Sequence, residues 1–127
     1  MIFEETKLKG AFVITPEPHV DERGQFARTF CKREFEAHGL CSNFVQMNHS
    51  KNSRAGTVRG LHYQLPPYCE VKLVRCVRGM VLDAIIDIRR DSPTFLQHFT
   101  VYLSDINQKM LYIPEGFAHG FRTLEPT

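Results

Sequence analysis

Residues 59–79 read RGLHYQLPPYCEVKLVRCVRG and join two short apolar runs through a loop that contains two prolines. The runs, TVRGLHYQ (57–64) and EVKLVRCV (70–77), are rich in Val, Leu and Tyr and are bounded by turn residues, which predicts two β-strands. Because side chains alternate along a strand, Lys72 and Cys76 share one face of the second strand. A lysine on a buried face is costly unless an anionic group meets it, so Lys72 is a candidate functional residue.

The rest of the chain also consists of short β-like runs that are separated by Gly, Pro, Asn and Asp residues. One segment differs: CKREFEAHG (31–39) has the spacing of a short helix that ends at Gly39. The pattern predicts an all-β sandwich or barrel with one short helix, in a single domain over residues 1–127. The further predicted strands are residues 10–15, 24–30, 43–50, 80–88, 97–103, 109–113 and 119–124.

Composition excludes several classes of protein. The 127 residues carry a net charge of +2, with 43% hydrophobic and 24% charged residues, which argues against disorder and against a basic surface for nucleic acid. No run is apolar enough for a signal peptide or a membrane span. The four cysteines have no zinc-ribbon spacing, so we expect free thiols, a buried Cys76 and a cytoplasmic location.

Arg59 and His62 are candidate functional residues of the first strand in the quoted stretch. Simple alternation places these two side chains on opposite faces. If both serve one pocket, the strand must contain a β-bulge, and Gly60 between them is the natural position for it.

Two other clusters carry polar side chains that suit chemistry. IPEGFAHGF (113–121) presents His119 directly after a Pro/Gly turn, and DERGQFARTF (21–30) places arginines on both sides of Phe26 in a predicted strand. Taken singly, each also fits an ordinary structural role. For Phe26, a place in the core of the barrel is an equal alternative.

The spacing P-x-G-x-x-H at residues 114–119 resembles the second sequence motif of the cupin β-barrel superfamily. The first motif fits only loosely: Gly56, His62 and Glu70 match, but Gln64 stands where metal cupins have their second histidine. A neutral amide is a poor ligand for the transition metals that imidazole favours. The resemblance therefore implies a cupin barrel without a metal, and a metal-dependent cupin of other activity remains an alternative.

Six runs in register carry a more specific resemblance: DERG-F, Q-NHS, RGLHYQLPP, KLVRCVRG, DIR-DSPTF and IPEGFAHGF. In this order, over about residues 10–124, they resemble the dTDP-4-dehydrorhamnose 3,5-epimerase family. The resemblance implies a cupin-type jelly roll, also called a double-stranded β-helix, that forms a homodimer and uses no cofactor. The implied reaction inverts a dTDP-4-keto-6-deoxyhexose at C3 and C5, or at C3 only, on the route to dTDP-rhamnose or a related deoxysugar.

The same resemblance assigns roles to residues of this chain. His62 matches the family's catalytic base, and an imidazole with an ordinary pKa of about 6.5 suits base chemistry at neutral pH. Lys72 matches the catalytic residue that stabilises the enolate oxygen, as a fixed ammonium can. The residues that match substrate contacts are Arg23, Phe26, Gln46, Asn48, Arg59 and His119.

The sequence departs from the family pattern at three places. Arg28 and Met47 stand where many members have Glu and Asp, which affects the identity of the sugar nucleotide. The chain ends where the family continues with further strands, which supply a tyrosine acid and an aspartate that orients the base. Of the tyrosines in this chain, Tyr63 is predicted to point away from His62, and Tyr68 is the only one that could replace the missing tyrosine acid. A sugar-nucleotide-binding protein with little or no epimerase activity is therefore the other alternative, and an open sheet edge near residues 119–124 favours self-association.

Overall fold

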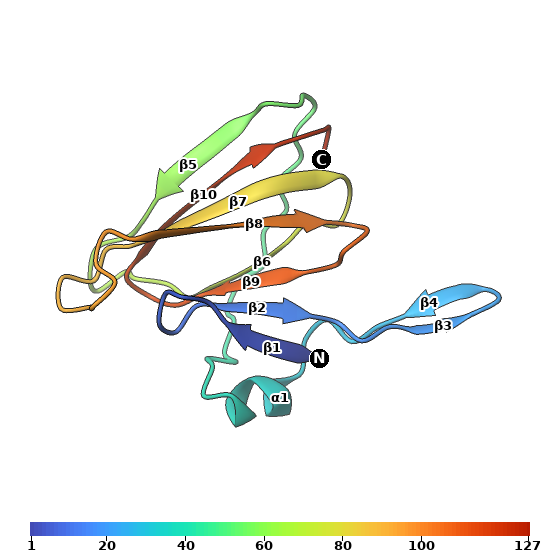
Figure 1. Cartoon of the computed structure of the whole chain (residues 1–127), viewed down its shortest axis with the longest axis horizontal. Helices are drawn as coiled ribbons and strands as arrows, with labels where there is room; N and C mark the ends of the chain where they lie inside the picture. Colours follow the sequence, from blue (N-terminus) through green and yellow to red (C-terminus); the bar gives the residue numbers. More distant parts are fainter.

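Two four-stranded antiparallel sheets face each other in the computed structural model, which describes residues 1–127 (Figure 1). The first sheet has the order β1-β2-β9-β6 and consists of β1 (Ile2–Glu5), β2 (Phe12–Thr15), β9 (Met110–Ile113) and β6 (Lys72–Arg75). The second sheet has the order β5-β10-β7-β8 and consists of β5 (Val58–His62), β10 (Phe117–Thr123), β7 (Met80–Asp87) and β8 (His98–Ser104). The predicted all-β fold with one short helix is confirmed.

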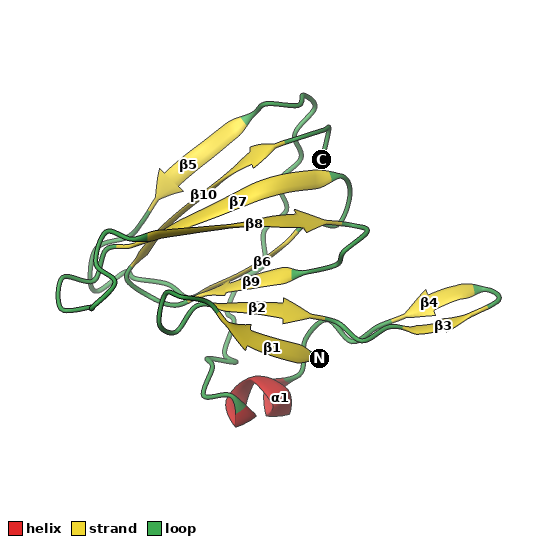
Figure 2. Ribbon diagram, viewed as in Figure 1, coloured by secondary structure: helices red, strands yellow, loops and turns green.

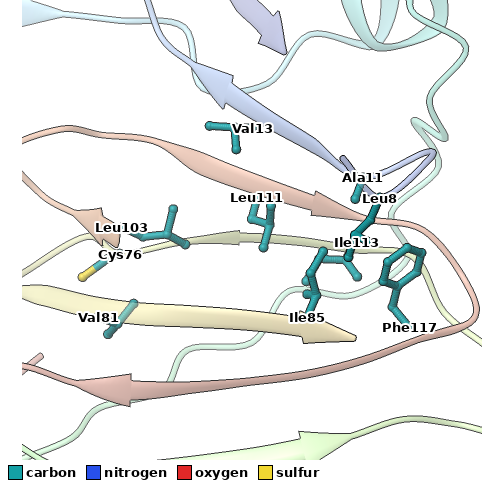
Figure 3. Packing of buried hydrophobic residues seen from close by; sticks show 10 residues of the cluster. All are labelled: Leu8, Ala11, Val13, Cys76, Val81, Ile85, Leu103, Leu111, Ile113 and Phe117. Carbon is teal, nitrogen blue, oxygen red and sulfur yellow. The ribbon is translucent and has the colours of Figure 1, made fainter. Parts of the chain in front are cut away.

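The core lies between the two sheets. Strand β7 alternates strictly between buried and half-buried residues, so Val81 and Ile85 point inward. They meet Leu111 and Ile113 of β9, and Figure 3 shows these side chains together with Phe117 in one layer. The ten buried residues of this layer are Leu8, Ala11, Val13, Cys76, Val81, Ile85, Leu103, Leu111, Ile113 and Phe117. The predicted burial of the free thiol of Cys76 is confirmed.

A single short helix covers the outer face of the first sheet. Helix α1 (Lys32–Ala37) buries Phe35 against Tyr112, whose ring lies 6.2 Å away on β9. The chain leaves the helix through Gly39 at φ +70°, the left-handed conformation that glycine adopts without strain. The predicted helix and its glycine terminus are confirmed.

A two-stranded hairpin projects away from the two sheets (Figure 1). It consists of β3 (His19–Asp21) and β4 (Gly24–Phe26), which pair in antiparallel register. The predicted strand over residues 24–30 is therefore only half right, since β4 ends at Phe26 and the chain then returns to the body. Strands β1 and β3 were not predicted, because both are short and carry charged or exposed residues.

The structure corrects one further expectation. Residues 43–50 form no strand, although Phe44 and Val45 favour one (Figure 2). No neighbouring strand pairs with them, and Val45 and Met47 are exposed. An open edge lies near residues 119–124, as expected: β10 is paired on both sides, and its neighbour β5 is the edge strand. No helix is long and apolar enough to cross a membrane.

Candidate active site

The predicted bulge in β5 is present and turns two candidate residues to the same side. His62 pairs with His119 of β10, and Arg59 pairs with Phe121, so the four residues 59–62 of β5 lie opposite the three residues 119–121 of β10. Directly paired residues of antiparallel strands point to the same face. Arg59 and His62 therefore share the inward face with His119, as the sequence required if they serve one site.

Two glycines make the bulge possible. Gly60 has φ +98°, and a Cβ atom there would lie 2.6 Å from the carbonyl oxygen of His119. A Cβ atom on Gly120, in the facing strand, would lie 2.5 Å from the carbonyl oxygen of Arg59. The two backbones approach so closely that neither position has room for a side chain.

His119 is held by a buried carboxylate that the sequence did not reveal. Its Nε2 lies 2.9 Å from Oδ1 and 3.0 Å from Oδ2 of Asp83, whose side chain is fully buried on β7. Burial raises the pKa of Asp83, and the hydrogen bond from His119 and the positive charge of Lys72 offset that rise only in part. The site is therefore anchored at its deepest point by one histidine–carboxylate pair.

Lys72 faces the interior from the opposite sheet. It pairs with Ile113, an inward-facing residue of β9, so its side chain lies on the inner face of the first sheet as predicted. The anionic groups that this position requires are supplied by the protein: Glu70 Oε1 lies 3.3 Å from Lys72 Nζ, and Asp83 is close enough for its pKa to be affected by the lysine charge.

A small pocket lies beside Lys72, and Tyr63 is one of the residues that line it. His62 does not line this pocket, so the expectation that Tyr63 points away from His62 stays a prediction. Tyr63 and Tyr68 are both largely exposed, and Tyr68 does not line the pocket. The pocket is lined by Tyr63, Gln64, Cys69, Glu70, Lys72, Gly116 and Phe117.

The remaining predicted site residues lie on exposed segments. Arg23 sits in the turn of the projecting hairpin, where its guanidinium is bound to Asp21 at 2.7 Å and is 85% exposed. Phe26, on the same hairpin, is 78% exposed, which rules out the alternative of a core residue. Gln46 and Asn48 are exposed on the irregular segment before β5. The structure does not bring these four residues into contact with His62.

The inward-facing residues form an arrangement suited to proton transfer. Two imidazoles lie on adjacent strands, an ammonium faces them from the other sheet, and exposure increases from Asp83 through His119 and Lys72 to His62. No group of three or more His, Cys, Asp and Glu side chains is arranged to hold a metal ion. The positive charge of Lys72 also disfavours a divalent cation at this position.

The fold is a cupin-type jelly roll whose interior carries two histidines, a lysine and an aspartate. A family model described as dTDP-4-dehydrorhamnose 3,5-epimerase matches residues 5–127. Proteins of that name from Shigella flexneri and Methanothermobacter thermautotrophicus are 50% and 46% identical to this chain, over 94% and 96% of it. The chain belongs to the dTDP-4-dehydrorhamnose 3,5-epimerase family.

Solved structures of the family match the fold closely. The Bacillus anthracis dTDP-4-dehydrorhamnose 3,5-epimerase with TDP and PPi bound has a TM-score of 0.95 at 42% identity, covering 98% of this chain and 71% of that chain. A Legionella pneumophila 3,5-epimerase in complex with dTDP-4-keto-L-rhamnose has a TM-score of 0.90 at 40% identity, covering 98% of this chain and 66% of that one. The chain spans 66% and 65% of the Shigella and Methanothermobacter relatives, just under two thirds of their length.

Proposed function

We propose that this protein epimerises a dTDP-4-keto-6-deoxyhexose at C3 and C5, or at C3 alone, as a step in the synthesis of dTDP-rhamnose or a related deoxysugar. The observation that carries the proposal is the convergence of His62, His119 and Lys72 on the inner faces of the two sheets. The relatives named as dTDP-4-dehydrorhamnose 3,5-epimerases support the substrate class.

The 4-keto group of such a sugar acidifies the hydrogens at C3 and C5. In the proposed reaction His62 removes the proton from C3, and the electron pair of the C–H bond moves into an enolate whose charge rests on the C4 oxygen. Lys72 stabilises that oxygen, and this interaction strengthens as the charge develops. A water molecule on the opposite face then donates a proton to C3, which inverts the centre, and His62 releases the abstracted proton to solvent.

Arg59 and His119 are proposed to bind the substrate around the reacting carbon. The guanidinium of Arg59 lies on the same face as His62 and can donate two parallel hydrogen bonds to a phosphate. Asp83 holds His119 in one ring orientation, so this imidazole is already oriented when the substrate binds. Gln46 and Asn48 are proposed to close the site from the exposed segment before β5.

Arg23 and Phe26 are proposed to act in the site of a second copy of the chain. Both are exposed on a hairpin that projects away from the body that carries His62 (Figure 1). In the proposed homodimer each hairpin reaches the site of the partner copy. Arg23 and Phe26 can then contact the substrate there although they lie far from His62 of their own copy. Phe26 would then pack on the nucleotide and Arg23 would bind its phosphates.

Mixing two inactive variants tests the shared site. In Arg23→Ala dimers every site lacks the arginine, and in His62→Ala dimers every site lacks the base. When the two variants are combined in equal amounts and exchange subunits, half of the dimers contain one copy of each variant. One of the two sites in each such dimer is intact, so about a quarter of wild-type activity should return. Recovery of no activity by the mixture would place Arg23 and His62 in the same copy.

We also propose that residues 1–127 act as one catalytic domain in the cytoplasm. All four cysteine thiols are free, as a reducing compartment favours.

The direct test of the function is conversion of dTDP-4-keto-6-deoxyglucose, followed by NMR through the coupling constants at C3 and C5. Inversion at C3, alone or with C5, supports the proposal. Tight nucleotide binding without inversion would support the alternative of a binding protein.

A further inference from the structure

Asn52 is a buried polar residue whose side chain is held in a single orientation. It is 5% exposed, and its backbone exchanges two hydrogen bonds with Thr127, of 2.7 and 3.0 Å. Its side-chain Nδ2 donates to Thr127 Oγ1 at 3.2 Å and to Ser50 Oγ at 3.4 Å. With both amide hydrogens engaged, the side-chain oxygen can point in only one direction.

That oxygen accepts a hydrogen bond from Arg59. The Nε of Arg59 lies 2.6 Å from Oδ1 of Asn52. Arg59 takes part in none of the ion pairs of the chain, so no carboxylate neutralises its charge. Because the contact uses only Nε, the two terminal nitrogens of the guanidinium keep their hydrogens for a ligand.

A neutral acceptor restrains an arginine without cancelling its charge. A carboxylate in the same place would hold the guanidinium as well but would compete with an anionic ligand for it. A side chain that is already ordered loses less conformational freedom when the ligand binds. The position of Asn52 therefore suits an arginine that must remain free to bind an anion.

We propose that Asn52 is a positioning residue that orders Arg59 for the diphosphate of the nucleotide. The inference rests on the proposed function for the class of ligand, and it adds a residue that the sequence pattern did not indicate. Asn52 does not touch the ligand in this arrangement. It acts through the orientation of Arg59, with its own orientation set by Thr127 and Ser50.

The experiment compares Asn52→Ala and Asn52→Asp with the control Ser53→Ala, which changes the exposed neighbouring residue and leaves the contacts of Asn52 and Arg59 in place. Calorimetric titration with thymidine diphosphate, and separately with inorganic pyrophosphate, should show about tenfold weaker binding for Asn52→Ala. Asn52→Asp should bind about as weakly as Asn52→Ala, because its carboxylate cancels the charge. Ser53→Ala should stay within about twofold of wild type.

The Nε–H signal of Arg59 in ¹⁵N NMR, assigned with Arg59→Lys, separates positioning from a merely structural role. It should exchange slowly with solvent in wild type and in Asn52→Asp and rapidly in Asn52→Ala, without ligand present. In turnover, Asn52→Ala should raise KM more than it lowers kcat. The Asn52→Asp arm tests the idea even if Asn52→Ala fails to fold.

Wild-type affinity in both Asn52 variants would overturn the inference, as would failure of wild type to bind either diphosphate. A failure of the proposed function looks different. Thymidine diphosphate would bind with the predicted order of affinities, but the 4-keto sugar would not be inverted.

Discussion

His119 contacts the buried side chain of Asp83 on the inner face of the second sheet, with Nε2 of the imidazole 2.9 and 3.0 Å from the two carboxylate oxygens. Asp83 is on β7 and His119 on the adjacent strand β10, yet the two do not face each other directly in the register, since Asp83 pairs with Phe121. The contact is therefore a diagonal one across the inner face of the sheet. It fixes the imidazole that lies beside His62.

Protonated Asp83 stabilises the folded protein, and its ionisation removes this stability as the pH rises. Burial raises the pKa of Asp83, so the folded state holds this proton more tightly than the unfolded chain. The stabilising contribution of the protonated carboxyl group is fully present below the ordinary carboxyl pKa of about 4. It is lost as the pH rises through the raised pKa of the folded state. Asp83→Asn cannot ionise, so its free energy of unfolding should improve relative to wild type between pH 4 and pH 8.

Urea unfolding followed by circular dichroism measures that difference, since the chain has no tryptophan to serve as a fluorescent probe. A difference between Asp83→Asn and wild type that does not change with pH, or that changes in the opposite direction, would contradict the account of Asp83.

Asp87 should show the opposite dependence on pH. Burial alone would raise its pKa, but hydrogen bonds from Arg89, Ser92 and Thr94 outweigh that effect and hold the pKa far below its usual value. Its stabilising contribution is therefore present above about pH 4 and is lost as the pH falls through the lowered pKa. Asp87→Asn should cost about 3 kcal/mol at pH 7.

The deficit of Asp87→Asn should shrink as the pH falls from 5 toward 2. The exposed neighbour Asp91 supplies the matched control, because Asp91→Asn changes the same charge outside this network. An equal loss of stability in the two variants would mean that the network around Asp87 contributes nothing.

The bulge of β5 should not tolerate a side chain at Gly60. In Gly60→Ala the new Cβ would meet the carbonyl oxygen of His119 at 2.6 Å and would sit at φ +98°. The strand must shift, at a cost of about 2–4 kcal/mol, and Arg59 and His62 should lose their common orientation. We expect lower stability in urea unfolding and loss of epimerase activity.

Gly39→Ala is the control for Gly60→Ala. Gly39 also has a positive φ, of +70°, but nothing lies within 4 Å of its Cβ position. It should cost only about 1 kcal/mol and leave activity unchanged. If the two variants lose equal stability, the close approach of the strands at Gly60 is not what constrains the bulge.

Much of the site could be predicted from local pattern. The inward face of Lys72 follows from strand alternation, and the common face of Arg59 and His62 follows from the need for a bulge at Gly60. Both are confirmed. These features depend on a few neighbouring residues, which is the range over which a sequence pattern is informative.

Asp83 could not be predicted in the same way. An acidic residue on a strand normally indicates a solvated face, and only the partner His119, 36 positions later, makes its burial tolerable. The strand predicted over residues 43–50 failed for a related reason: β-propensity alone does not form a strand without a neighbour to pair with. Tertiary partners decide both cases.

Lys72 should matter more for proton removal than for binding. Its ammonium faces the site from β6, and its charge is most valuable once the enolate forms. We expect Lys72→Ala to slow exchange of the C3 hydrogen by about 100-fold while the affinity for thymidine diphosphate changes little. Lys32→Ala on α1, with an exposed lysine, is the control. Weaker nucleotide binding with unchanged exchange would assign Lys72 to the phosphates instead.

The central claim is that His62 removes the proton from C3, and deuterium exchange measures this step directly. Proton NMR of dTDP-4-keto-6-deoxyglucose in heavy water follows loss of the C3 signal with wild type, with His62→Ala and with the control His98→Ala, which changes an exposed histidine of β8. We predict exchange with wild type and with His98→Ala, and a rate about 10²–10⁴-fold lower with His62→Ala. Equal exchange rates with wild type and His62→Ala would contradict the account.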